Sequence, residues 1–581
     1  MRQIRPRYLV LLLSILMIFS GITTAWLVQN SFGSVITTEI DFSTHEGVNI
    51  HSTLQVPRVA SESHPLPGVV VIHGVYQSKE WLRAFGIELS RRGFVVLTID
   101  AASHGNSGYA EYESDRGGAA ALEYLNSLEY VSNLGIIGHS MGAGIAIQAL
   151  ELTTLTIDAL VFIGGGSRNI DEWANSTYPK NLLITIGKYD ELFDIPSLRT
   201  SLASTFNKTT SITSGRLYGS FSDGTARKLV IGQTNHLFEI IDPIIVCETV
   251  EWLKESLKGS GNDPHWIPKK NLVFPIHFLG GLISSLGILL SFFPVLSILI
   301  DLPFFQSLKK NPSSSYYVNN RRYWLFGGLY AFISLGLFIP ALLLPLFPFP
   351  QNMGSSVGVW LIGSSTISLI VLYFIYRYHR INANQDFTQK DFGVDFSNLK
   401  ETIPIFGRSA LMAFLVVLWA YLWMMPFDVV LALDFSAFLP LFNDLPLAPP
   451  RLLIAPLYLI FTIPFFLVEG MWLMGLLRTN PKDTWVKTQF SWSMRAVLIK
   501  IIPYILILLI QLTISFLIGS PFVSGILGFY LLFLWMFIPF FIITTFFTTW
   551  SYHLTRRVYI SAVLNALIVS WTLASILTLT M

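Results

Sequence analysis

The feature that most constrains this chain is a series of long apolar stretches that fills its second half. After about residue 270 charged residues become sparse, and successive hydrophobic segments approach the roughly 20 residues that a helix needs to cross a bilayer. The whole chain is 52% hydrophobic and only 13% charged, about half the usual charged fraction. We therefore expect an all-α membrane domain over residues 263–581 with about eight spans, near residues 273–300, 323–347, 356–376, 409–427, 452–477, 497–519, 522–549 and 558–580.

The first 30 residues predict one further span. Arg2, Arg5 and Arg7 precede an uncharged stretch over residues 8–28, which would be about 30 Å long as a helix. A cleaved signal peptide has a shorter apolar core. We interpret residues 1–30 as a transmembrane signal anchor, with the amino terminus in the cytoplasm and the following domain outside.

The loops between the spans alternate in charge. If residues 31–262 are extracytoplasmic, every second loop should be cytoplasmic and basic. The loop around Gln351 is uncharged, the segment 428–444 is acidic, and the turn at Gly519 has no charge. Nine spans with the carboxyl terminus outside, in the cell membrane, are consistent with this pattern. The basic loops carry Lys309, Lys310, Arg321 and Arg322; Arg377, Arg380, Lys390, Lys400 and Arg408; Arg478, Lys482, Lys487 and Arg495; and Arg556 and Arg557.

Residues 31–262 show alternating strand and helix patterns. Trp81, Phe85 and Leu89 recur at helical spacing, and a last helix is expected near residues 242–258. Continuous β-branched runs between helices predict a mostly parallel sheet covered on both faces, with functional groups at the carboxyl ends of its strands. We expect an antiparallel hairpin over 35–56 and buried strands over 68–74, 94–100, 134–138, 159–165, 181–187 and 227–232.

One strand runs directly into a G-x-S-x-G motif. The motif is Gly138-His139-Ser140-Met141-Gly142, and a helix follows it. Such a pentapeptide is weak evidence alone, but a sharp strand-to-helix turn needs glycines because the two elements approach too closely for side chains. We therefore predict that Ser140 is a nucleophile exposed on this turn.

A serine hydroxyl needs a base to accept its proton and a carboxylate to orient that base. Asp190 follows the strand over 181–187, and His236 follows the strand over 227–232. The order Ser–Asp–His along the chain fits a serine on such a turn. Asp190 could instead serve as a turn or helix cap, and His236 as a packed side chain. The competing acids are Glu191, Asp194 and Asp223.

Residues 35–258 resemble the α/β-hydrolase superfamily, in the style of monoacylglycerol lipases, dienelactone hydrolases and serine aminopeptidases. The resemblance rests on the G-x-S-x-G motif, on His73-Gly74 after an earlier strand, and on residues 100–107. That last segment is similar to the D-x-x-G-H-G-x-S pattern of the family, with Ser103 in place of a glycine.

The resemblance implies an oxyanion hole formed by the backbone N–H groups of Val75 and Met141. Such donors contribute about 3–4 kcal/mol each to stabilising a tetrahedral intermediate. It also implies that Tyr76 lines the substrate pocket. Many lipase relatives insert a lid where this chain has only residues 167–180. The site would then be open, or covered by the segment 207–226.

The membrane half resembles no family that we recognise. Glu469 and Lys500 lie inside adjacent spans and could form a buried ion pair, for which a structural role is the simpler interpretation.

These features predict a membrane-anchored serine hydrolase that cleaves an ester, thioester or amide through an acyl-enzyme. Its partners would be membrane lipid and a small-molecule or lipid-like acyl substrate. The alternative is a transporter or receptor whose hydrolase-like domain binds a ligand or is coupled to transport.

No metal or cofactor is expected, since no metal motif or phosphate-binding glycine loop occurs and Cys247 is the only cysteine. A net charge of +2 gives no indication of nucleic-acid binding.

Overall fold

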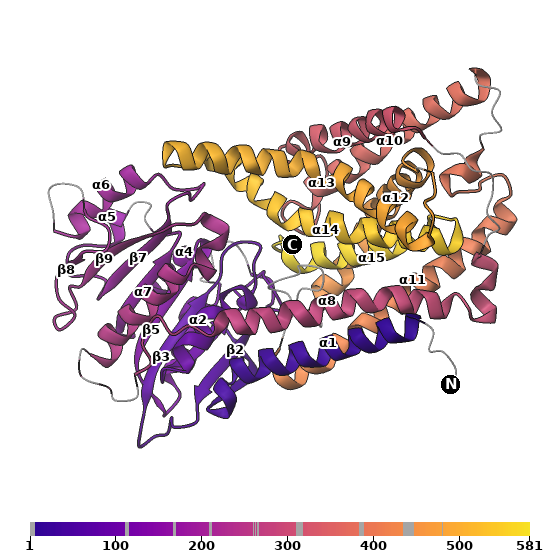
Figure 1. Ribbon diagram of the computed structural model, residues 1–581. Helices are drawn as coiled ribbons and strands as arrows, with labels where there is room; N and C mark the ends of the chain where they lie inside the picture. Colours follow the sequence, from indigo (N-terminus) through magenta and orange to yellow (C-terminus); the bar gives the residue numbers. More distant parts are fainter. Residues whose placement is uncertain are drawn as a thin grey trace.

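The computed structural model describes two parts, a sheet domain and a helical bundle, which lie side by side (Figure 1). The sheet domain contains the elements from β1 to α7, and the bundle contains α1 and all elements from α8 onward. Lys310 and the segment 434–444, which entered the charge pattern of the loops, lie outside the described residues. The structure describes residues 6–110, 116–166, 170–207, 212–259, 261, 263, 266–309, 318–382, 388–433, 447–478 and 480–580.

Nine helices in the described residues are long and apolar enough to cross a membrane, which agrees with the predicted number. Hydropathy finds the apolar centre of a span but not its ends. For this reason α13 begins 12 residues and α11 ten residues before the predicted spans, at Trp485 and Leu399. The helices are α1 (Pro6–Gln29), α8 (Phe274–Leu299), α9 (Asn320–Leu342), α10 (Gly354–Asn382), α11 (Leu399–Leu431), α12 (Pro449–Met471), α13 (Trp485–Ile518), α14 (Gly525–Thr555) and α15 (Tyr559–Ile576).

The amino-terminal helix α1 is an integral part of the bundle and packs lengthwise against α8 (Figure 1). Gly21 faces the backbone oxygen of Gly280, and a side chain at either position would overlap the other helix. Small residues permit this close approach, as in many membrane helix pairs.

The bundle contains the expected buried ion pair. Lys500 Nζ lies 2.8 Å from a carboxylate oxygen of Glu469. The hydroxyl of Tyr330 donates to the same oxygen at 2.8 Å, and Lys500 donates to Thr544 Oγ1 at 3.2 Å. Each charge therefore has an opposite charge and a further polar partner, as a structural pair requires.

Every described contact between the bundle and the sheet domain lies at one end of the bundle. The backbone N–H of Gly525, at the start of α14, donates to Glu191 O at 2.7 Å. Leu579, after α15, donates to Ser103 O at 3.0 Å. Arg451 of α12 is buried and donates to Gly105 O at 2.6 Å and to carbonyl oxygens at the end of α15. The sheet domain is thus fixed to the bundle by hydrogen bonds as well as by the chain connections.

The sheet has nine strands in the order β1-β2-β4-β3-β5-β6-β7-β9-β8. Strands β4, β3, β5, β6, β7 and β9 are mutually parallel, while β1, β2 and β8 pair antiparallel. The hairpin and all six predicted buried strands are present, and β8 is the one strand that the sequence patterns did not indicate. The bounds are β1 (Val35–Ser43), β2 (Asn49–Pro57), β3 (Leu66–Ile72), β4 (Val95–Ile99), β5 (Val131–His139), β6 (Ile157–Ile163), β7 (Leu182–Gly187), β8 (Leu217–Tyr218) and β9 (Arg227–Gly232).

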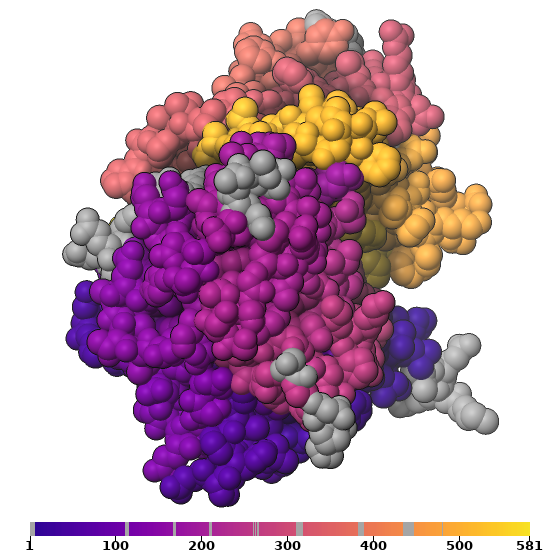
Figure 2. Space-filling model, turned by 90° about the vertical axis from the view of Figure 1, so that its left-hand side faces the viewer, coloured from indigo at the N-terminus to yellow at the C-terminus, as the bar shows by residue number. Residues whose placement is uncertain are grey.

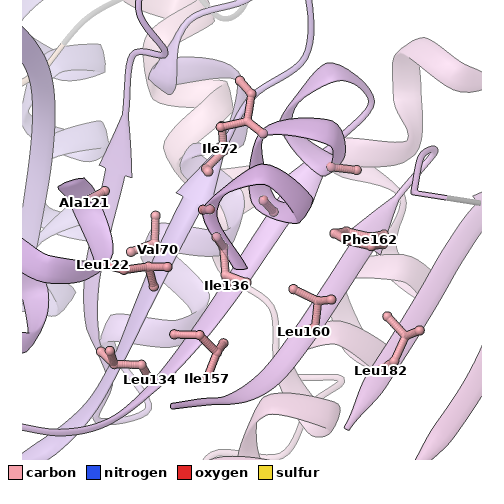
Figure 3. Close-up of a cluster of buried hydrophobic side chains, with 14 of the residues drawn as sticks. Val70, Ile72, Ala121, Leu122, Leu134, Ile136, Ile157, Leu160, Phe162 and Leu182 are labelled. Atoms are coloured by element: carbon pink, nitrogen blue, oxygen red, sulfur yellow. The ribbon is translucent and has the colours of Figure 1, made fainter. Parts of the chain in front are cut away.

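Helices cover both faces of the sheet, as predicted. One face packs against α3 (Gly118–Asn126), α4 (Met141–Leu152) and α6 (Ile195–Thr205), and the other against α2 (Arg83–Ser90) and α7 (Pro243–Leu253). Alternate residues of each strand enter opposite cores, so Val70 and Ile72 face α3 and α4 whereas Val69 and Val71 face α2 and α7 (Figure 3). The short helix α5 (Ile170–Trp173) follows β6. Seen from the sheet-domain side, this domain forms the near face of the molecule, with bundle helices behind it (Figure 2).

Candidate active site

Ser140 lies on the sharp turn between β5 and α4. Its backbone has φ +51° and ψ −113°, a conformation that a residue with a side chain rarely adopts. The flanking glycines are required because a Cβ at Gly138 would overlap the backbone of Gly142, and one at Gly142 would overlap the carbonyl oxygen of Ile72. The turn therefore has the strained geometry that the motif predicted, and it places the hydroxyl at the carboxyl end of β5.

The structure brings Ser140, His236 and Asp190 into one hydrogen-bonded chain. His236 Nε2 lies 2.9 Å from Ser140 Oγ, and His236 Nδ1 lies 2.8 Å from Asp190 Oδ2. The backbone N–H of Leu192 donates to the other Asp190 oxygen at 2.7 Å. Both Asp190 and His236 are buried. With Nδ1–H donating to the carboxylate, Nε2 is free to accept the hydroxyl proton of the serine.

Each of these side chains comes from the carboxyl end of a parallel strand. Asp190 follows β7 in a turn, and His236 begins the 3-10 helix His236–Ile241 after β9. Asn235 precedes that helix, and its side-chain oxygen accepts from Phe238 N at 3.3 Å. The three groups meet because the strands end at the same edge of the sheet.

The competing acids occupy other positions. Glu191 is buried beside the backbone N–H of His236, at 3.3 Å, and burial raises its pKa to about 7. Asp194 caps α6 by accepting from Ser197 N at 2.9 Å. Asp223 accepts from Thr225 in an exposed turn. Of the four acids considered from the sequence, only Asp190 reaches the imidazole ring.

A second carboxyl near His236, that of Glu239, was missed by the sequence reasoning. One oxygen accepts the backbone N–H of Gly187, and the other lies 3.6 Å from His236 Nδ1 and 3.8 Å from His139 Nε2. Burial and the adjacent Asp190 charge raise the pKa of Glu239 well above its ordinary value. Glu239 lies three residues after His236, a spacing that puts two side chains on the same side of a helical turn. This spacing is the sequence signal from which Glu239 could have been inferred.

The two backbone N–H groups predicted to act as oxyanion donors lie at different strand ends, that of Val75 after β3 and that of Met141 after β5 at the start of α4. Among the described residues, the N–H groups of Val75 and Met141 make no hydrogen bond within the protein. The turn after β3 is held in place because Gly74 N donates to Gln77 Oε1 at 2.9 Å, and the same oxygen lies 3.0 Å from His139 Nδ1. Both donors therefore remain available beside Ser140.

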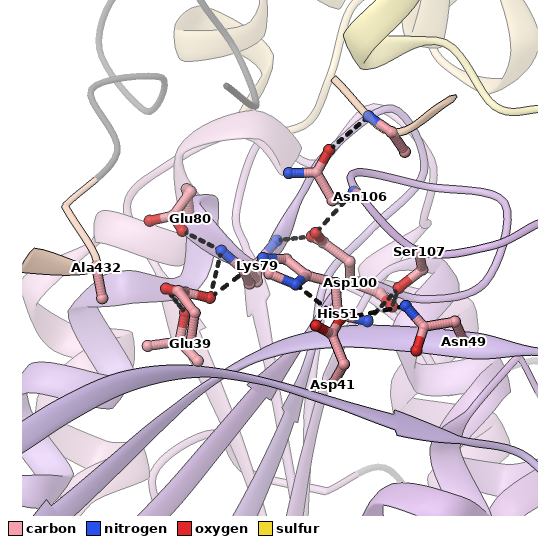
Figure 4. Close-up of polar contacts among 12 residues, drawn as sticks. Glu39, Asp41, Asn49, His51, Lys79, Glu80, Asp100, Asn106, Ser107 and Ala432 are labelled. Atoms are coloured by element: carbon pink, nitrogen blue, oxygen red, sulfur yellow. Dashed lines mark hydrogen bonds and ion pairs between the residues drawn. The ribbon is translucent and has the colours of Figure 1, made fainter. Parts of the chain in front are cut away.

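The loop over residues 100–107 supports this turn and contacts the bundle (Figure 4). Asp100 accepts from Lys79 N at 2.7 Å and from Asn106 N at 3.0 Å, while Asn106 accepts from Ala448 N of the bundle at 3.1 Å. Ser103, the departure from the family glycine, has φ +69°. Its hydroxyl exchanges hydrogen bonds with the backbone of Ala110, which holds a serine in a conformation that glycine adopts freely.

In the part of the chain that the structure describes, residues of the bundle lie over the site. The described part of segment 207–226 lies at β8 on the sheet edge and lines neither cavity next to Ser140. The larger cavity, about 790 Å³, is bordered on the bundle side by Asn352 and residues 578–580. The smaller, about 40 Å³, is bordered on the bundle side by α14. Tyr76 lines this smaller cavity, its ring 5.6 Å from that of Phe533.

One group of described side chains has the ligand spacing of a metal site. Potential ligand atoms of His139, His236 and Glu239 lie within 4.8 Å of one another. Both ring nitrogens of His236 already contact Ser140 and Asp190, and the adjacent Glu239 carboxyl has a raised pKa. The set therefore fits a proton-transfer site better than a metal site.

Residues 69–244 match the Alpha/beta hydrolase family, and with its sheet topology this part of the chain has the α/β-hydrolase fold. No curated protein matches the chain significantly. The solved structures that it resembles include a predicted CIB-like hydrolase from Thermoplasma acidophilum (16% identity, 38% of this chain and 99% of that chain, TM-score 0.30). They also include Est1E from Butyrivibrio proteoclasticus with ferulic acid bound (16%, 37% and 98%, 0.30) and an esterase from Pyrococcus furiosus (18%, 39% and 93%, 0.30). The protein thus combines a hydrolase fold with a bundle of membrane-type helices.

Proposed function

We propose that this protein is a membrane-anchored serine hydrolase that cleaves an ester, thioester or amide through an acyl-enzyme. The observation that carries the proposal is the hydrogen-bonded chain from Ser140 Oγ through His236 to Asp190, on a strained turn that opens into a cavity. A ligand-binding domain has no need of a nucleophile, base and orienting acid in register.

In the proposed reaction, Ser140 Oγ attacks the substrate carbonyl carbon while its proton passes to His236 Nε2. The N–H groups of Val75 and Met141 stabilise the oxyanion. Collapse of the tetrahedral intermediate breaks the bond to the leaving group, which takes the proton from His236. Water then attacks the acyl-enzyme with His236 as base, releasing the carboxylic acid and restoring the serine. Asp190 accepts from the Nδ1–H of His236 and holds the imidazole in the required tautomer.

We also propose that the hydrolase domain lies outside the cytoplasmic membrane. Among the described residues, the helix ends that contact this domain adjoin the non-basic loops. Basic side chains such as Lys309, Arg478 and Arg557 belong to the opposite connections. Because basic loops are retained in the cytoplasm, the domain would face the other side. Proximity of the site to α14 favours amphipathic or lipid-like substrates.

The test is covalent labelling with a fluorophosphonate probe, which phosphonylates only an activated serine. Wild type and Ser140→Ala are compared in membranes, and the probe is also added outside sealed cells. Labelling that disappears in Ser140→Ala supports the nucleophile, and labelling in sealed cells supports the orientation. Absence of labelling in folded wild type would favour a ligand-binding role instead.

A further inference from the structure

A line of apolar space leads from Ser140 into the membrane bundle. The smaller cavity beside Ser140 is bounded by His236, Tyr76 and the first half of α14. A second cavity, about 60 Å³, lies deeper in the bundle between α9, α10, α12, α14 and α15. Phe533 and Met536 line both cavities. These two side chains therefore stand between the nucleophile and the interior of the bundle.

The deeper cavity is suited to a hydrocarbon chain. Aromatic rings and aliphatic side chains form nearly all of its wall, and Thr544 and Thr572 are the polar-type exceptions. Because α14 rises about 1.5 Å per residue, Met536 lies about 17 Å and Thr544 about 29 Å along the helix from its first residue Gly525. These depths lie within the roughly 30 Å hydrocarbon thickness of a bilayer. An apolar cavity of this kind excludes water and favours an apolar occupant.

The larger cavity on the other side of Ser140 has a different character. Its lining mixes polar side chains, such as Arg116 and Gln148, with apolar ones such as Phe193. Ser140 and Val75 line both this cavity and the smaller apolar one. The attacking oxygen and one proposed oxyanion donor thus lie where the larger cavity of mixed lining and the smaller apolar cavity meet.

We propose that the apolar cavities bind the acyl chain of the substrate, with its end inside the membrane bundle, and that the larger cavity of mixed lining receives the leaving group beside its polar side chains. This inference rests on the proposed serine-hydrolase function and specifies its substrate class as esters of a straight, medium-length fatty acid with a polar alcohol. The two apolar cavities, about 40 and 60 Å³, have room for roughly seven to ten water-sized groups at about 10–15 Å³ each. A chain of about eight carbons therefore fits.

Met536 is the residue at which to close the path. A methionine side chain is unbranched and flexible, so it can move aside for a chain. Met536→Trp would fill the connection between the cavities and leaves the identities of Ser140, His236 and Asp190 unchanged. Leu527→Trp is the matched control, because Leu527 lies on the same helix, lines neither cavity and is 45% exposed.

The first experiment compares p-nitrophenyl acetate with p-nitrophenyl octanoate, using the full chain in lipid nanodiscs. Each buried methylene favours the longer ester by up to about fourfold in kcat/KM. Met536→Trp should lower the octanoate-to-acetate ratio at least about tenfold, equivalent to losing about two buried methylenes, while Leu527→Trp keeps the wild-type ratio. An unchanged ratio in Met536→Trp that still hydrolyses acetate would overturn the proposal.

A second experiment needs no variant. An alkyl fluorophosphonate with a diazirine at the end of a chain of about eight carbons is attached to Ser140 and photolysed, and the crosslinked peptides are identified by mass spectrometry. Phe537 and Trp360 line the deeper cavity. Crosslinks to the peptides that contain them support an acyl chain inside the bundle. Phe193 and Asn352 line the larger cavity. Crosslinks to their peptides place the chain in that cavity and overturn the inference, while the serine-hydrolase function stands. If the probe does not react with wild type, the proposed function fails and the acyl-chain inference fails with it.

Discussion

Glu239 provides a sharp test of how the site is charged. Its carboxyl is fully buried, and burial together with the negative charge of Asp190 raises the pKa of Glu239 well above its ordinary value. We predict that this side chain is neutral at pH 7.5, and the variant below tests that prediction. Glu239→Gln keeps the size and neutrality of that group. We expect kcat/KM for p-nitrophenyl acetate at pH 7.5 to stay within about threefold of wild type, less than about 1 kcal/mol in activation free energy.

The alternative, an ionised Glu239, has a calculable signature. Its nearer oxygen lies 3.6 Å from His236 Nδ1. Two unit charges at that separation interact by about 4.6 kcal/mol at an effective dielectric constant of about 20, equivalent to about three pH units. The negative charge would favour protonated imidazole, so removing it would move the acidic limb of the pH–kcat/KM profile down by that amount. We expect the limb to move by less than about half a pH unit, and a fall of two units or more would refute a neutral Glu239.

Stability against pH gives a second assay for the same change. Folding raises the pKa of this carboxyl. Its contribution to the stability of the native state is therefore fully present below the pKa of the unfolded state and is lost as the pH rises through the pKa of the folded state. Between about pH 4.5 and its folded pKa, Glu239 should therefore lower the free energy of unfolding by up to about 1.4 kcal/mol per pH unit. Glu239→Gln should remove this slope. Asp190→Asn is the contrasting variant, since loss of the orienting carboxylate should cost about 10⁴-fold in kcat.

Three further predictions concern other parts of the structure. Gly142→Ala places a Cβ against the Ile72 carbonyl oxygen. Fluorophosphonate labelling should therefore be lost, and the thermal transition should fall by the equivalent of about 1–3 kcal/mol. Full labelling of this variant would contradict the strained turn. Glu191→Gln should make the thermal transition less pH-dependent between pH 4.5 and about 7, by up to about 3 kcal/mol, because the wild-type carboxyl has a pKa of about 7 and loses stability through that window. Lys500→Met should destabilise the bundle by about 3–5 kcal/mol by leaving Glu469 unpaired. The double variant Lys500→Met/Glu469→Leu should recover most of that loss, and no recovery would show that the pair is not the source.

Local sequence patterns determined the order and type of the elements. The β-branched runs gave the buried strands because a strand covered on both faces must be apolar on both. The apolar segments gave the nine helices because backbone polar groups in a bilayer must be satisfied within one segment. Gly138 and Gly142 marked the turn at Ser140 because neither position has space for a side chain. Each of these constraints acts over a few neighbouring residues and can therefore be inferred from the sequence itself.

Only the tertiary structure decided which groups meet across the chain. Asp190 and Glu191 are neighbours in one turn, and the packing of β7 beside β9 determines that Asp190 contacts the His236 ring. The same packing buries Glu239 beside them. The cover of the site also comes from segments hundreds of residues away, α14 and residues 578–580, through the docking of the bundle on the hydrolase domain. No local pattern specifies such contacts, because they depend on how complete surfaces fit together rather than on the preference of any one segment.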